Sequence, residues 1–360
     1  MTREQMTTGL VEKIADAVLY EGYILYPYRS SAVKNQQRWN FGALCPESYS
    51  LAQTGTESWT MQTECLVQQK QGTLLTVKVR FLQLVQRDVA QVIFDCPVEL
   101  ADCGHQRIGP GSSHFALVPW LEVNGRRWQS WQEAVERNVC VPALNVDGAT
   151  EPARTPFSFA AGESIEPLLN ESDGKTVGVM RRTQQEITGA VEITTTQLAD
   201  NLTRVNVQIL NLTPLVNAGE SSRDTALLRS FVSTHTILNV TCGEFVSLLD
   251  PPESLREAAA GCRNVGTYPV LVGEEGARDC ILSSPIILYD YPQIAPESPG
   301  SLYDGTEIDE ILTLRIMTLT DEEKREMRDT DERARQILER TELLPAEQLL
   351  KMHGAMKSVK

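Results

Sequence analysis

The sequence contains no apolar run that approaches the ~18 residues a membrane-spanning helix needs. Its first twenty residues, MTREQMTTGLVEKIADAVLY, also lack the apolar core and the small-residue cleavage site of an export signal. They have instead the spacing of a short amphipathic helix, with Leu10, Val11 and Ile14 on one face. We therefore predict a cytoplasmic protein with a helix near its N-terminus.

Closely spaced cysteine pairs are absent as well. The eight cysteines are scattered along the chain without a C-x-x-C pair, whereas a secreted disulfide scaffold is shorter and denser in cysteine. In a reducing compartment such residues are free thiols, and most of them are expected to be buried.

Basic residues are fewer than acidic ones, with 33 Lys and Arg against 48 Asp and Glu, which gives a net charge of −15. Nucleic-acid phosphates and anionic membrane surfaces would repel a chain of this charge. The predicted partners therefore include neither a nucleic acid nor a membrane.

Recognisable catalytic motifs are missing. The sequence has four histidines, no G-x-S-x-G elbow, no H-E-x-x-H helix and no G-x-G-x-x-G loop. Gly174-Lys175-Thr176 matches the end of a P-loop, but Leu169 stands where the first glycine of that motif is required. We predict no cofactor and favour a non-catalytic protein over an enzyme.

The alternative is an enzyme or metal carrier whose site is assembled from dispersed Cys and His residues. Cys96, Cys103 and His105 are its candidate ligands, because thiolate and imidazole bind zinc or nickel. Structural zinc sites usually show two tight ligand pairs, however, and C-x6-C-x-H is not such a spacing. A loop with two buried thiols is therefore the favoured interpretation.

Strand patterns dominate the chain up to about residue 319. Residues 73–85 alternate, with Leu75, Val77, Val79 and Phe81 on one face and Thr76, Lys78 and Arg80 on the other. Residues 63–69 are predicted to pair with them as a hairpin through Lys70, Gln71 and Gly72. The predicted fold is mainly β, with β-sandwich or barrel-like domains and a few helices.

A similar pattern recurs 128 residues later, where residues 191–212 predict a strand, a turn at residues 199–201 and a second strand. Periodicity alone can produce such a match, so duplication of a domain and convergence both remain open. The length allows two domains. We place a β-rich domain at residues 1–150, a linker rich in Pro, Gly and acid at 151–180, and a second β-rich domain at 181–319.

Residues 320–360 change in character. Thr320 and Glu323 have the spacing of a capping box, and the residues that follow are mostly charged with a narrow apolar stripe that includes Met327 and Leu338. They predict an exposed helix over about 320–340. Within the preceding domain, residues 251–262 predict a short helix, and residues 311–319 predict a strand.

Two tyrosine-rich segments are the candidate binding surfaces. The window from Gly22 to Pro46 has no acidic residue, and aromatic and Arg side chains are frequent anchors of protein interfaces. The second segment, residues 283–300, contains four prolines that favour extended backbone. Packing of these tyrosines in the core is the structural alternative. The candidate interaction residues are Tyr23, Tyr26, Tyr28, Arg29, Lys34, Asn35, Arg38, Trp39, Tyr289 and Tyr291.

Residues 19–46 (LYEGYILYPYRSSAVKNQQRWNFGALCP) and 282–335 together resemble an uncharacterised bacterial family encoded beside [NiFe] hydrogenase structural and maturation genes. The resemblance covers both ends of the chain and supplies no catalytic residues. It implies a partner, a hydrogenase subunit or maturation factor. With the missing catalytic motifs, it leads us to expect an accessory or assembly protein that acts by protein–protein binding.

Overall fold

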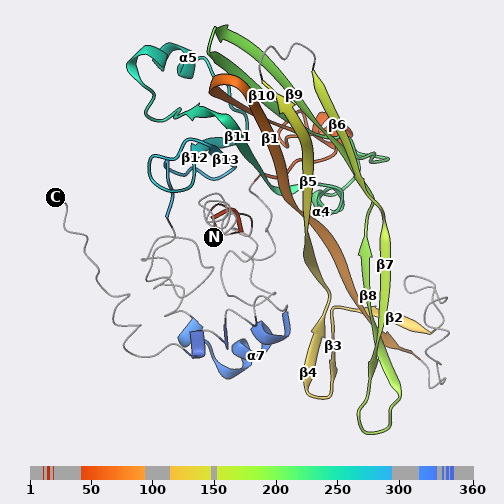
Figure 1. Cartoon of the computed structure of the whole chain (residues 1–360). Coiled ribbons are helices and arrows are strands. Elements are labelled where there is room, and N and C mark those ends of the chain that lie inside the picture. The colour runs from red at the N-terminus through yellow and green to blue at the C-terminus, as the bar shows by residue number, and fades with distance from the viewer. Residues whose placement is uncertain are drawn as a thin grey trace.

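The structure is a computed structural model of the 360-residue chain. It describes residues 42–93, 114–146, 152–293 and 316–330, with further positions at residues 11, 14–16, 19, 335, 338–339 and 341–343. The described chain is mainly β, with antiparallel pairing throughout and a few short helices (Figure 1). The predicted fold class is therefore confirmed.

One strand, β1 (Thr60–Val92), organises the sheet. It contains 33 residues, so at ~3.3 Å per residue a straight strand of this length would span about 110 Å. One of its edges pairs first with β11 and then with β8, and its other edge pairs in turn with β10, β5 and β2. β1 thereby joins a wide upper part of the sheet to a narrow lower arm (Figure 1).

The upper part has the strand order β12-β13-β11-β1-β10-β9-β6. The bounds of its other strands are β6 (Ala153–Phe159), β9 (Ile187–Ala199), β10 (Leu202–Asn211), β11 (Val232–Val246), β12 (Tyr268–Leu271) and β13 (Cys280–Ser284). The predicted hairpin over residues 191–212 is confirmed, because β9 and β10 pair around the turn at Asp200 and Asn201.

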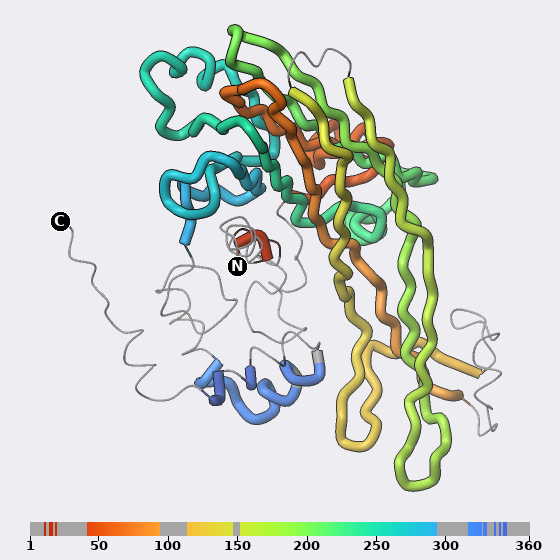
Figure 2. The backbone as a smooth tube through the Cα atoms, in the orientation of Figure 1, coloured from red at the N-terminus to blue at the C-terminus, as the bar shows by residue number. Residues whose placement is uncertain are grey.

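The lower arm adds short and long strands around the second half of β1. They are β2 (Phe115–Val118), β5 (Trp131–Asn145), β7 (Gly162–Leu169) and β8 (Thr176–Gln184). A separate two-stranded sheet, β3 (Trp120–Val123) with β4 (Arg126–Gln129), lies beside this arm. Figure 2 shows β6–β7 and β8–β9 as two nearly continuous lengths of backbone tube that run together from the upper part to the tip.

The hairpin predicted across Lys70, Gln71 and Gly72 is wrong, because β1 continues through these residues. Gly72 has a positive φ of 81°, and the pairing with β11 shifts register between Gln69 and Leu74. The Thr73 hydroxyl accepts from Lys70 N and contacts the carbonyl of Cys242 at 2.7 Å. The glycine therefore makes a bulge within one strand rather than a chain reversal.

The segment predicted as a linker, residues 151–180, is also different in the structure. It contains β6, β7 and the start of β8, so it is not a connection without secondary structure. Two prolines, Pro156 and Pro167, obscured these strands in the sequence. Each lies in a strand that pairs along one side only, where a missing backbone N–H does not break the ladder.

The described parts of the two predicted domains share one sheet, since β1 pairs with strands from both sides of the predicted boundary. The two matching segments also differ in structure. Residues 63–85 belong to one strand, whereas residues 191–211 form a hairpin.

The helices are short. They are α2 (Glu47–Ala52), α4 (Arg223–Leu227), the 3-10 helix η2 (Glu253–Leu255), α5 (Arg256–Ala260) and α7 (Asp321–Thr330). The helix predicted at 251–262 is confirmed by η2 and α5. Thr320 and Glu323 form the predicted capping box, each side chain bonding the other residue's backbone N–H. Ile316 and Met317 are helical, so the strand predicted over residues 311–319 is wrong at these two positions.

The main core lies on one face of the upper sheet. The predicted inner face of β1, with Leu75, Val77 and Phe81, is buried there against residues of β9 and β10. On the opposite face of the sheet, the helical residues Val11, Ile14 and Ala15 pack against Ile237, Val270 and Leu282. Val11 and Ile14 are two of the residues expected on the apolar face of an N-terminal helix.

All six cysteines within the described residues are free, as predicted, although Cys140 and Cys242 are exposed rather than buried. Among the described helices, none is both long enough and apolar enough to span a bilayer.

Candidate functional site

Most of the predicted interaction residues, from Tyr23 to Trp39, lie outside the described residues, as do Cys96, Cys103 and His105. Tyr289 and Tyr291 are described and do not share a face. Tyr289 is 83% exposed, whereas Tyr291 packs against the main core and its hydroxyl donates to the Ala277 carbonyl at 2.9 Å. Burial raises the pKa of Tyr291. Tyr291 therefore contributes to packing, and Tyr289 alone of this pair offers a free ring.

Within the described part of the chain, no group of three or more His, Cys, Asp or Glu side chains is arranged to hold a metal ion. The β3–β4 hairpin instead brings tryptophan and arginine side chains together. Its sequence, WLEV-NG-RRWQ, joins two short strands through Asn124 and Gly125, whose φ angles are 53° and 74°. Two consecutive positive φ values are those of a type I′ turn, which asparagine and glycine favour.

One face of this hairpin packs on the arm. Leu121, Val123 and Trp128 contact an apolar cluster formed by Val89 of β1, Leu168 of β7 and Met180 of β8. The contact is close at Gly178, where a Cβ would lie 2.4 Å from Leu121 Cδ2. The hairpin is therefore held as a second layer over the arm.

The other face carries a tryptophan and an arginine side by side. Arg127 lies over the Trp120 ring with its guanidinium carbon 4.1 Å from the ring centre, and Trp120 is 48% exposed. A second pair follows on the inner face, where Arg126 lies 3.9 Å from the centre of Trp128. Such cation–π contacts contribute ~0.5–1 kcal/mol each at exposed sites, and they fix the orientation of both side chains.

The base of the hairpin is fixed to β1 by hydrogen bonds. Ser130 N donates to the Pro119 carbonyl at 2.8 Å, and its hydroxyl donates to the Val118 carbonyl at 3.0 Å. The same hydroxyl accepts from Val89 N at 3.0 Å. Both ends of the hairpin are thus tied to each other and to the central strand.

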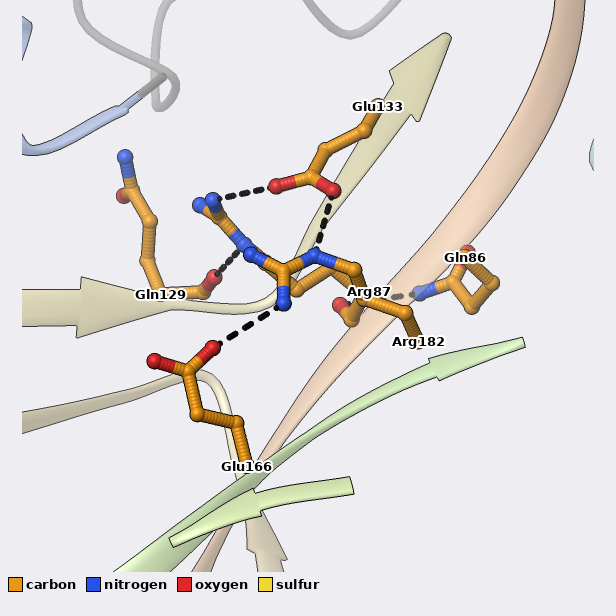
Figure 3. A network of polar contacts seen from close by, with 6 residues as sticks. All are labelled: Gln86, Arg87, Gln129, Glu133, Glu166 and Arg182. Atoms are coloured by element: carbon orange, nitrogen blue, oxygen red, sulfur yellow. Dashed lines mark hydrogen bonds and ion pairs between the residues drawn. The ribbon is translucent and has the colours of Figure 1, made fainter. Parts of the chain in front are cut away.

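An ion-pair network centred on the buried Arg87 supports this base (Figure 3). Arg87, 5% exposed, donates from Nε to the Gln129 carbonyl at 3.0 Å and from Nη1 to Glu133 at 2.8 Å. Arg182 donates to the other oxygen of Glu133 at 2.8 Å and to Glu166 at 3.2 Å. Burial alone would lower the pKa of Arg182, but its bonds to Glu133 and Glu166 raise it above its ordinary value. The network links β1, β4, β5, β7 and β8 across the arm.

The tip of the hairpin is tied to the neighbouring β7–β8 turn. Asn124 donates from its side-chain amide to the Leu169 carbonyl at 2.8 Å, and its side-chain oxygen accepts from Glu171 N at 3.1 Å. The asparagine that suits the type I′ turn therefore also joins two hairpins.

The edge of β4 is covered by α7. Asp329 accepts a hydrogen bond from Arg127 N at 3.1 Å, and its other oxygen lies 3.9 Å from Arg126 Nε. Figure 1 shows α7 beside the β3–β4 hairpin. This contact brings the predicted C-terminal helix to the candidate site.

We expect Gly178→Ala to weaken the packing of the hairpin, because the new methyl group would meet Leu121 Cδ2 and the Ala90 carbonyl oxygen, the latter at 2.6 Å. Overpacking of this kind costs ~1–3 kcal/mol. Urea denaturation followed by tryptophan fluorescence measures the change. Gly162→Ala in β7 is the matched control, since nothing lies within 4 Å of its Cβ position. Equal stabilities of the two variants would contradict the packing described.

Sequence reasoning missed this site although a signal was present. Asn-Gly is a strong hairpin signal, and here it stands between two short segments that each contain a tryptophan. The stacking of Trp120 on Arg127 could not be read in the same way, since it depends on the register of the two strands. No protein-family model matches the chain, and no curated protein is significantly similar to it.

Proposed function

We propose that this protein is a non-catalytic accessory protein that binds another protein through the outer face of the β3–β4 hairpin. The observation that carries the proposal is the Trp120–Arg127 pair, held on a hairpin whose base, tip and inner face are all fixed. Tryptophan and arginine are enriched among the residues that contribute most to protein–protein binding.

Rigidity supports this role. Ordering a mobile side chain at an interface costs ~0.5–1.5 kcal/mol, and a face that is already ordered avoids much of that cost. The network of Arg87, Glu133 and Arg182 holds the strands beneath the hairpin in one arrangement. The outer face is therefore already ordered before a partner binds, as a preorganised binding surface is.

The resemblance of both chain ends to a family encoded beside [NiFe] hydrogenase genes makes a hydrogenase subunit or maturation factor the proposed partner. We propose that this protein binds its partner in the cytoplasm. The acid-free window, with Arg29, Lys34 and Arg38, is the second proposed contact with the same partner.

A tagged pull-down from the native host, followed by identification of the captured proteins, tests the proposal. The double variant Trp120→Ala, Arg127→Gln should capture the partner at least about thirtyfold more weakly, the effect of losing ~2 kcal/mol at an interface. The fold should persist, because Trp120 is half exposed.

The matched control is Tyr268→Ala, Arg256→Gln, which removes an exposed ring and an exposed guanidinium in the upper part of the molecule. This control should capture the partner as the unchanged protein does. A third variant, Arg29→Gln, Lys34→Gln, Arg38→Gln, examines the acid-free window separately. Unchanged capture by the Trp120 variant would exclude the hairpin as the binding face.

A further inference from the structure

The contact between α7 and the edge of β4 has the chemistry of a carboxylate-binding site. A single carboxylate, that of Asp329, faces two donors on neighbouring residues: the backbone N–H of Arg127 at 3.1 Å and the Nε of Arg126 at 3.9 Å. Asp329 itself is 12% exposed, so its carboxylate is largely withdrawn from water. A two-residue segment that presents both a backbone and a guanidinium donor suits the two oxygens of one carboxylate.

Asp329 does not satisfy Arg126 fully. The Nε atom of Arg126 is buried and has no hydrogen-bond partner, since 3.9 Å is too long for a hydrogen bond. Burial lowers the pKa of Arg126, the positive charges of Arg335 and Arg87 lower it further, and the carboxylates of Asp329 and Glu166 only partly oppose them. Arg126 therefore keeps a buried donor atom that the carboxylate of Asp329 does not reach.

The helical unit that carries Asp329 is held together by its own contacts. Ile316, Met327 and Leu338 form a small apolar cluster, and Glu342 pairs with both Lys324 and Arg328. None of these contacts involves the hairpin. The unit can therefore leave β4 without losing the contacts that define it.

We propose that the edge of β4 at Arg126 and Arg127 is a binding site for a carboxylate of an acidic protein segment, and that Asp329 occupies this site in the isolated protein. The inference rests on the proposed function and names the chemistry of the partner: a segment with Asp or Glu side chains displaces α7 and gains access to the hairpin. A tethered group competes at high effective concentration. An acidic segment must therefore bind the site with high affinity to displace Asp329.

The test uses the full chain and a short fluorescein-labelled oligoglutamate peptide as the probe, with binding followed by fluorescence anisotropy at low salt. Asp329→Asn removes the competing charge, and we expect it to bind the probe about tenfold more tightly than the unchanged protein, as for one charge-assisted hydrogen bond. The gain should shrink as salt is added. An oligoserine peptide is the uncharged probe and should bind neither protein.

Asp321→Asn is the matched control, because it makes the same change on an exposed position of the same helix. It should leave probe binding unchanged. Adding Arg126→Gln to Asp329→Asn should abolish the gain. Equal binding by the Asp329 and Asp321 variants, or a gain that survives the loss of Arg126, would overturn the inference.

The same variants separate this inference from the proposed function. If Asp329→Asn gains no affinity for oligoglutamate while partner capture still depends on Trp120, the carboxylate site is refuted and the binding face stands. If Asp329→Asn binds oligoglutamate more tightly but partner capture does not depend on Trp120, the carboxylate site is supported and the proposed function is refuted.

Discussion

Replacing Phe81 with alanine should lower the free energy of unfolding by about 3–5 kcal/mol, the range for truncating a fully buried aromatic ring. Phe81 has no exposed surface and stacks on Phe231 with the ring centres 4.6 Å apart. It also contacts Phe157 and Phe159, each at 6.0 Å between centres. The loss would therefore affect β1, β6 and the segment that leads into β11 together.

The packing around these rings leaves little space for repair. A Cβ added at Gly189 would lie 2.5 Å from a carbon of Phe157 and 2.7 Å from one of Phe231. Neighbours confined in this way cannot move far to fill a cavity, which places the expected loss in the upper part of the range.

Equilibrium denaturation in urea measures this loss. Val135→Ala in β5 is the control, because Val135 is 39% exposed and its truncation should change stability by no more than ~0.5 kcal/mol. A Phe81 variant that unfolds at the same urea concentration as this control would show that the rings do not form the principal core.

The second large effect is expected at Arg80. Its side chain is 3% exposed and donates to Asp16 of the N-terminal helix at 2.5 Å and to Glu136 of β5 at 2.6 Å. Removing both carboxylates by Asp16→Asn, Glu136→Gln leaves the buried guanidinium without these two charges. Leaving a buried charge without its partners costs ~3–5 kcal/mol, and we expect the lower end of this range because both carboxylates are partly exposed.

Single variants should differ in a defined order. Asp16→Asn should cost less, within the ~0–1 kcal/mol of an exposed pair, because Asp16 is 53% exposed. Glu136→Gln should cost more, since Glu136 is 29% exposed and makes two hydrogen bonds with Arg80. Arg80→Met, which removes the buried charge itself, should be less harmful than the double acid variant.

Thermal and urea denaturation of these four variants measure the order of their stabilities. The neighbouring His235, the register partner of Arg80 on β11, does not complicate the comparison. Burial lowers its pKa to about 4, so it adds no positive charge at neutral pH. If the double acid variant is as stable as Arg80→Met, the guanidinium is not held by these carboxylates.

The sequence predicted those parts of the fold that local patterns determine. Alternation identified β10 and the inner face of β1, and the capping box at Thr320 located the start of α7. The continuity of β1 could not be predicted in the same way, because the bulge at Gly72 depends on a contact between Thr73 and Cys242, 169 residues further along the chain.

Arg80 shows what alternation leaves undetermined. Alternation placed Arg80 with Thr76 and Lys78 on the polar face of β1, where Thr76 is exposed. Arg80 is covered, since the helix that carries Asp16 lies over this part of the sheet. Periodicity assigns a residue to a face of a strand, but only tertiary packing decides what covers that face.

The candidate site was predictable in part. Asn124 and Gly125 mark the hairpin, but the roles of Trp120 and Arg127 depend on the pairing of the two strands, and that of Asp329 depends on a contact across 202 residues. Residues 22–41 of the acid-free window and the residues Cys96, Cys103 and His105 lie outside the described residues, so the interpretations given for them remain predictions.

The length of β1 has a consequence for synthesis of the chain. β1 ends at Val92, but β11, its main partner along one edge, is complete only at Val246, 154 residues later. At ~5–20 residues per second, a ribosome needs about 8–30 s to make that stretch. During this interval β5 can already pair along the other edge, while the edge that β11 will cover presents unpaired backbone groups. The nascent protein therefore passes through a long-lived stage with an open sheet edge. A chaperone that binds the chain at this stage would have access to that edge.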